Sequence, residues 1–287
     1  MKRTNNFFKS SKDDSPFVRI LVHLGIIIAC IVSIFPIIRV FSISIRPGDR
    51  LLSTSLAIIP KDATVANYIE VLLHTDFFIW IRNSLLVTII TSIFGVVLAI
   101  SAGYAFSRFR FPARRIGLIF LLATQMAPAA MLLLPLYIIL SKFGFVDTYQ
   151  GLIIAYSVTA LPFSIWLLKG YFDTIPFDLE EAAMMDGCTQ LGSFYRIVLP
   201  LSKPCIAIAG LFNFAAAWND YIVARAIIHD PKLYTWTIGL TKFMGEGDVR
   251  WGLYAASAVL IALPITMLFL YSSKWLLTGL TLGALKE

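Results

Sequence analysis

Acidic side chains gather in a polar segment that lies between two strongly apolar stretches of the chain. Glu180, Glu181 and Asp186 carry negative charge at neutral pH, so the chemistry open to them is ion pairing with cationic groups of a partner. The sequence contains neither HExxH nor GxSxG, and its three histidines are isolated. The three cysteines also lack CxxC spacing, so neither a metal site nor a disulfide framework is indicated. We expect docking rather than catalysis, and no enzymatic activity.

Local sequence signals predict a short helix over residues 179–186. Asp178 is expected to be the N-cap residue, and Glu181, three positions later, completes a variant of the capping box. Gly187 is expected to end this helix, because glycine adopts the positive φ that a helix terminus often requires.

The surface of this short helix is expected to suit a partner. Ala182 and Ala183 are small, so a cleft in another protein would approach the backbone closely, while the acidic residues attract its cationic groups. The plainer interpretation is that Glu181 only caps its own helix and Gly187 only ends it. The two interpretations are compatible.

Composition places the surrounding chain in a membrane. Of its 287 residues, 58% are hydrophobic and only 14% are charged, which leaves too little polar surface for a soluble globule of this size. A membrane-spanning helix needs roughly 20 apolar residues. The sequence therefore predicts an all-α, polytopic fold with six spans, at residues 17–43, 82–106, 116–140, 151–169, 205–228 and 252–277.

The distribution of lysine and arginine favours an orientation with both termini in the cytoplasm, because cationic loops resist translocation. We therefore divide the chain into a polar tail (1–16), a six-helix domain (17–278) with a cytoplasmic loop (171–203), and a C-terminal tail (279–287). A short interfacial helix is also predicted over 65–73. No aromatic-interleaved basic stripe points to nucleic acid.

Two features inside the predicted spans bear on helix packing. Gly95, Ala99 and Gly103 recur every fourth residue, which puts small side chains on one face and permits a close helix contact. Prolines remove backbone hydrogen bonds and are expected to kink the helices that contain them. They stand at positions 128, 135, 162 and 264.

The polar segment also matches a known motif at every fixed position. The pattern is EAA, three residues, Gly, nine residues, then Ile-x-Leu-Pro, and it is filled by Glu181, Ala182, Ala183, Gly187, Ile197, Leu199 and Pro200. It resembles the cytoplasmic coupling loop of binding-protein-dependent ABC importer permeases. The resemblance implies the type I importer permease fold, a coupling helix that ends at Asp186 and Gly187 and enters a cleft of an ATPase subunit, and an anchor at Ile197, Leu199 and Pro200.

The chain has no GxxxxGK[ST] phosphate loop, so ATP and Mg are expected on a separate ATPase subunit, with no cofactor here. Trp218, Asn219 and Asp220 are similar to a WN-acidic signature of the carbohydrate-uptake branch. All three are candidate pathway or gate residues. Asn219 and Asp220 are polar groups near membrane depth, although a hydrogen bond between helices is an equal alternative for them. The stretch containing Gly279 and Gly283 resembles the tail of the smaller maltose-type permease, which implies contact with the ATPase subunits.

The resemblance implies a set of partners in a bacterial or archaeal cytoplasmic membrane. These are a second homologous permease, an ATPase dimer, an extracytoplasmic solute-binding protein and a mono- or oligosaccharide moved by alternating access. Two alternatives remain open at this stage. One is an ABC permease for polyamine, phosphate or peptide, and the other is a self-sufficient channel or secondary carrier.

Overall fold

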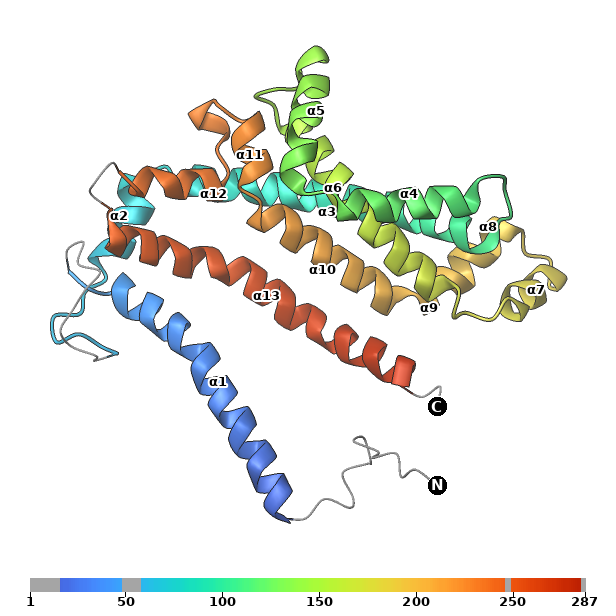
Figure 1. Cartoon of the computed structure of the whole chain (residues 1–287), viewed down its shortest axis with the longest axis horizontal. Helices are drawn as coiled ribbons and strands as arrows, with labels where there is room; N and C mark the ends of the chain where they lie inside the picture. Colours follow the sequence, from blue (N-terminus) through green and yellow to red (C-terminus); the bar gives the residue numbers. More distant parts are fainter. Residues whose placement is uncertain (1–15, 48–57, 246–248, 285–287) are drawn as a thin grey trace, which may run out of the picture.

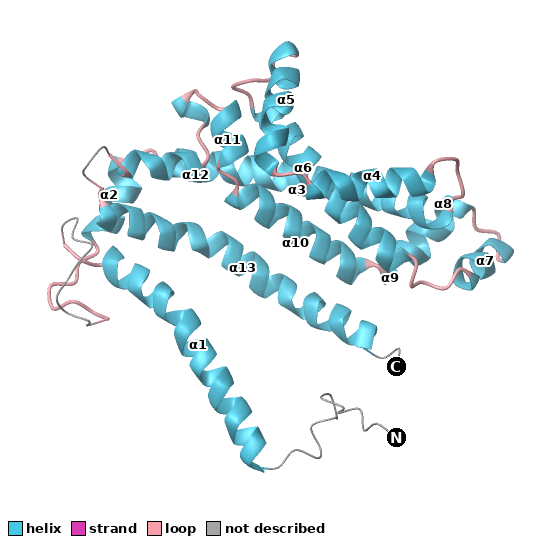
Figure 2. Ribbon diagram, viewed as in Figure 1, coloured by secondary structure: helices cyan, strands magenta, loops and turns pink. Residues whose placement is uncertain are grey.

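The computed structural model describes residues 16–47, 58–245 and 249–284. Over these residues the chain is helical and contains no β-strand beyond one isolated bridge, so the all-α prediction is confirmed (Figure 2). The helices are α1 (Pro16–Ser44), α2 (Ala66–His74), α3 (Phe77–Arg108), α4 (Arg114–Met126), α5 (Ala129–Lys142), α6 (Tyr149–Phe172), α7 (Asp178–Met185), α8 (Gln190–Ser193), α9 (Leu199–Leu201), α10 (Lys203–Asn219), α11 (Ile222–Ile227), α12 (Trp236–Gly239) and α13 (Trp251–Ala284). A π-helical turn, Phe194–Val198, and two 3-10 turns, Pro231–Leu233 and Leu240–Phe243, complete the described secondary structure.

The described helices supply four continuous apolar spans, α1, α3, α6 and α13, or up to six if each of two bent pairs is one span. The predicted span 116–140 is such a pair, because α4 and α5 meet at Ala127 and Pro128. Proline disfavours a helical conformation in the residue before it, and Ala127 is indeed extended, with ψ of 132°. The kink expected at Pro128 is confirmed, and it bends the two halves of the span by 106°, so that they diverge (Figure 1).

The predicted span 205–228 is also interrupted. Helix α10 ends at Asn219, and Asp220 is extended with ψ of 130°. The side-chain Oδ1 of Asp220 then accepts the backbone N–H groups of Val223 and Ala224, at 3.0 and 3.1 Å, and so starts α11. An aspartate that satisfies the free N–H groups of a new helix explains why the chain breaks here.

Helix α3 lies at the centre of the bundle and packs against α6 and α10 through the small residues predicted for this purpose. A Cβ added at Gly95 would lie 2.9 Å from the amide nitrogen of Asn213 on α10. One added at Gly103 would lie 3.2 Å from Cβ of Leu168 on α6, and Ala99 between the two glycines is fully buried. The predicted close helix contact is confirmed.

The two terminal helices lie at the edge of this bundle. Helix α1 contacts α13 near its C-terminal end, and the rest of its apolar surface is exposed in the single chain (Figure 1). Asn67 on α2, the predicted short helix, donates to the carbonyls of Ser44 and Arg46 and so holds the end of α1. Helix α13 continues through the predicted tail boundary, so Gly279 and Gly283 are helical, whereas residues 1–15 and 285–287 lie outside the described range.

Candidate functional site

Helix α7 occupies almost the predicted range, but it begins differently from the prediction. The N-cap residue is Phe177, whose side chain makes no capping bond, and Asp178 is the first helical residue. The predicted capping box is therefore wrong. The carbonyl of Phe177 accepts the N–H groups of Glu180 and Glu181, at 2.9 and 3.0 Å, and acidic residues of the first turn face the positive end of the helix dipole.

The C-terminal end of α7 confirms the prediction for Gly187. Its φ is +88°, a left-handed conformation that glycine adopts without a Cβ clash. The N–H of Gly187 donates to the carbonyl of Met184, and the N–H of Cys188 donates to that of Ala183, both at 3.0 Å. These two bonds form a Schellman motif, which satisfies carbonyls that the helix itself leaves free.

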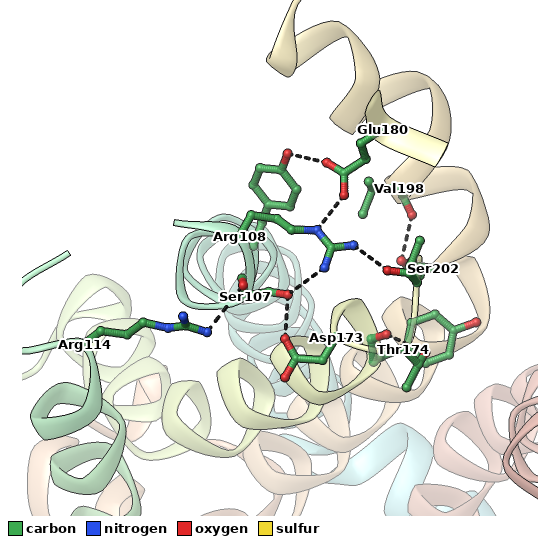
Figure 3. A network of polar contacts seen from close by, with 11 residues as sticks. Ser107, Arg108, Arg114, Asp173, Thr174, Glu180, Val198 and Ser202 are labelled. Atoms are coloured by element: carbon green, nitrogen blue, oxygen red, sulfur yellow. Dashed lines mark hydrogen bonds and ion pairs between the residues drawn. The ribbon is translucent and has the colours of Figure 1, made fainter. Parts of the chain in front are cut away.

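Glu180 does not face a partner, contrary to the prediction. Its side chain is only 1% exposed and forms an ion pair with Arg108, with 2.5 Å between Oε1 and Nε. The hydroxyl of Tyr104 donates to the other carboxylate oxygen at 2.7 Å (Figure 3). The desolvation of this carboxylate is offset by two strong bonds from α3, so Glu180 fastens α7 to the bundle.

Arg108 also binds the segment that leads into α7. Its Nη2 donates to the carbonyl of Ile175 at 2.9 Å, and its guanidinium lies 5.8 Å from the ring centre of Phe177. Tyr104 and Arg108 were missed in the sequence, where the basic residues after α3 indicated only topology. The available signal is their spacing of four, which puts both side chains on one face of α3.

The chain that returns from α7 to the membrane is anchored by buried aromatic and aliphatic side chains. Phe194 packs on Tyr104 with ring centres 4.3 Å apart, and Val198 is fully buried. The predicted anchor residues Ile197 and Leu199 are half-buried, and Pro200 is exposed. Residues 194–198 form a π-helical turn, a rare element that is frequent at functional sites.

The outward surface of α7 and its neighbours is a mixture of acidic and apolar groups. We call it the docking face, and it also includes exposed side chains that the sequence analysis did not single out. Ala183 is buried and does not belong to it, so the predicted surface role of both alanines is wrong for this residue. The docking face comprises Leu179, Glu181, Ala182, Met185, Asp186, Gly187, Leu191 and Tyr195.

The predicted pathway residues 218–220 point in three directions. Trp218 is 1% exposed and stacks on Phe214 in the core, with ring centres 5.5 Å apart. Asn219 is exposed, donates to the carbonyl of Ala215 and borders a cavity of about 290 Å³. Asp220 caps α11, as described above. Of the three, Asn219 alone lines this cavity, together with Tyr221, Trp236, Thr237, Leu240, Thr241, Met244 and Tyr254.

A second polar contact region lies at the other end of α3. Asn83 is fully buried, and its amide nitrogen donates to the carbonyls of Lys232 and Tyr234 at 2.9 and 3.0 Å. Ser84 Oγ accepts the backbone N–H of Trp236 at 2.8 Å. These bonds fasten the segment between α11 and α12 to α3.

Over its described residues, the chain is all-α and carries four to six helices apolar enough to cross a membrane, so it is a polytopic membrane protein. The chain belongs to the family described as binding-protein-dependent transport system inner membrane component, which matches residues 75–281. The resemblance drawn from the EAA segment is thereby confirmed, and the chain is an inner membrane component.

Individual relatives agree with this assignment over nearly their whole length. The chain is 34% identical to the maltose/maltodextrin transport system permease protein MalG of Salmonella typhimurium, covering 93% of this chain and 95% of the relative. It is 31% identical to the galactooligosaccharides transport system permease protein GanQ of Bacillus subtilis, covering 94% and 96%. A solved bacterial ABC transporter involved in the import of the acidic polysaccharide alginate shares the fold, with a TM-score of 0.79 at 23% identity over 93% of this chain and 98% of that one.

Proposed function

We propose that this chain is a permease subunit of a binding-protein-dependent ABC importer that moves a mono- or oligosaccharide across the cytoplasmic membrane. The observation that carries the proposal is α7, a capped helix whose inner face is fastened to α3 and whose outer face is free. In this arrangement, a partner that binds the outer face and displaces α7 also displaces the helices to which its inner face is bound. The names of the relatives support a sugar as the solute, since they transport maltodextrins and galactooligosaccharides.

A separate ATPase subunit would grip the docking face. Glu181 and Asp186 supply negative charge for cationic groups in its cleft, and Met185, with 88% of its surface exposed, supplies an apolar anchor. ATP and Mg would bind to that subunit, and closure of an ATPase pair would displace α7. Gly279 and Gly283, in the last turns of α13, remain proposed contacts of the ATPase.

A second permease subunit would complete the membrane domain. Helix α1 is covered on little of its surface, and an apolar groove of about 780 Å³ runs between α3, α10 and α13. Either lipid or protein must cover these surfaces in a bilayer, and a homologous permease provides both a cover and a second wall for a pathway. An extracytoplasmic solute-binding protein would deliver the sugar at the end of the bundle opposite α7.

The cavity beside Asn219 suits a sugar. It combines an exposed amide with hydroxyl-bearing Thr237 and Thr241 and with the rings of Tyr221 and Trp236. Aromatic faces pack against the C–H surfaces of sugar rings, while amides and hydroxyls bond the sugar hydroxyls. Trp218 lies behind this cavity in the core, and Asp220 fixes its edge by starting α11. A non-sugar solute is the second candidate, and a solute screen with the cognate binding protein distinguishes the two.

The test begins with purification of the tagged chain from its native membrane in mild detergent, followed by mass spectrometry of the proteins that copurify. We expect a Walker-type ATPase, a second EAA-bearing permease and a sugar-binding protein. Recovery of the chain alone, under conditions that preserve a known importer, would favour a self-sufficient carrier.

Variants of the reconstituted importer then test the docking face. Glu181→Lys reverses the charge on the docking face and is expected to abolish transport and ATPase coupling while the chain still inserts into the membrane. Asp62→Lys is the matched control, because Asp62 is an exposed carboxylate on the segment before α2. Equal transport by both variants would contradict the docking role.

A further inference from the structure

Three helices, α4, α5 and α6, separate α7 from α3 along the chain. Helix α7 follows α6 in the chain and leads through α8 and the π-helical turn to α10, so its movement reaches those two spans through the backbone. Arg108 and Glu180 are 72 positions apart in the chain. The link between α7 and α3 therefore depends on side chains.

That link is compact and buried. We call Tyr104, Arg108 and Glu180 the α3 joint. The side chains of Arg108 and Glu180 are only 8% and 1% exposed, and each carboxylate oxygen of Glu180 accepts a hydrogen bond from a residue of α3 (Figure 3). Arg108 also holds the carbonyl of Ile175 at 2.9 Å. A guanidinium presents several donors in a fixed plane, so the joint resists rotation as well as separation.

Helix α3 is built to carry a displacement along its length. It runs for 32 residues without an internal proline, whereas α1, α6 and α13 contain Pro36, Pro162 and Pro264. At 1.5 Å per residue it extends for about 48 Å. Near its N-terminal end, Asn83 and Ser84 hold residues 232–236, whose Trp236 and neighbours border the cavity beside Asn219.

We propose that the α3 joint positions α7 for coupling, and that it passes the displacement of α7 through α3 to the segment 232–236. Arg108 and Glu180 are thus positioning residues of the transport cycle and touch neither nucleotide nor solute. This inference rests on the proposed function, because it concerns how an ATPase that displaces α7 opens a distant pathway. Asn83 and Arg108 are 25 residues apart on α3, which corresponds to about 40 Å along the helix.

The experiment uses the complete importer in proteoliposomes, with the solute-binding protein and its sugar supplied. Three quantities are measured for each variant: the ATPase subunit retained on purification, the ATPase rate with and without the loaded binding protein, and the sugar imported per ATP hydrolysed. The variants are Arg108→Gln, Glu180→Gln, the double variant and Arg108→Lys. Arg110→Gln is the matched control, because Arg110 is an exposed arginine two positions from the joint.

We expect Arg108→Gln to retain the ATPase subunit and its basal hydrolysis, but to import at least tenfold less sugar per ATP. Arg108→Lys is expected to recover part of this ratio, because lysine keeps the charge and loses the planar set of donors. The double variant is expected to couple better than either single variant, since each single change leaves one buried charge without its partner. Arg110→Gln is expected to match the unaltered importer.

The outcomes separate the two proposals. If the unaltered chain retained no ATPase subunit, the proposed function would fail, and this inference with it. If the unaltered importer worked, and the four joint variants imported as much sugar per ATP as it does, the joint would have no role in coupling. If the single variants did not assemble, the double variant would be the test, because its two neutral amides fit the space of the original pair. Normal coupling in the double variant would then overturn the inference.

Discussion

Replacement of Gly187 by alanine tests whether backbone conformation defines the end of α7. The φ of +88° costs an L-residue with a Cβ about 1–2 kcal/mol, whereas no heavy atom lies within 4 Å of the added Cβ. The penalty therefore comes from the residue's own backbone and not from a clash with neighbouring residues. It raises the equilibrium constant for opening the Schellman motif about 5–30-fold.

Hydrogen exchange measured by mass spectrometry reports this opening directly. The amides of Gly187 and Cys188 make the two capping bonds, so peptides that cover residues 183–190 are expected to exchange about 5–30-fold faster in Gly187→Ala. Gly170→Ala is the matched control, because its Cβ also meets no atom and its φ is not positive. Gly187→Asn is expected to be intermediate, since asparagine tolerates the left-handed region. Unchanged exchange in Gly187→Ala would refute the argument from φ.

Three further predictions concern other parts of the molecule. Burial alone would raise the pKa of Asp147, but the N–H groups of His229 and Asp230 hold this pKa below its ordinary value of 3.8. A lowered pKa stabilises the fold at pH values above the ordinary pKa, so Asp147→Asn should lower the unfolding temperature at pH 7, by an amount that shrinks as the pH falls below about 4. A difference in unfolding temperature that stayed constant with pH would contradict this prediction. Gly239→Ala puts a Cβ 2.1 Å from Trp80 and should destabilise the protein by about 1–3 kcal/mol, measured by thermal unfolding. An unchanged unfolding transition would refute this expectation. Met185→Ser should weaken ATPase retention at least tenfold, about 1.4 kcal/mol, without lowering the unfolding temperature, and equal retention would remove Met185 from the docking face.

Several features of the fold follow from local properties of the sequence. Apolar runs of about 20 residues predicted the spans, because the free energy of membrane burial adds up along a helix. Gly187 predicted the end of α7, because the left-handed conformation is a property of one residue. Gly95 and Gly103 predicted close helix contacts, because small residues let neighbouring helices approach the backbone.

The interruptions of the spans were harder to predict. Pro128 was recognised as a source of a kink, but the sequence does not state how far the two halves of a broken span diverge. The break at Asp220 depends on its side chain reaching Val223 and Ala224, which competes with continuation of α10. A hydropathy pattern averages over such a competition and therefore extends the predicted span to residue 228.

Glu180 and Glu181 mark the division between what the sequence determined and what the tertiary structure decided. The sequence determined that two adjacent carboxylates begin a short helix, and it assigned both of them to a partner. The fold decided that Glu180 is buried against Arg108 while Glu181 is exposed. Adjacent residues on a helix point about 100° apart, so only one of them faces the bundle. Which one it is depends on an arginine 72 positions away, whose place beside α7 is set by the packing of α3 and not by any local signal.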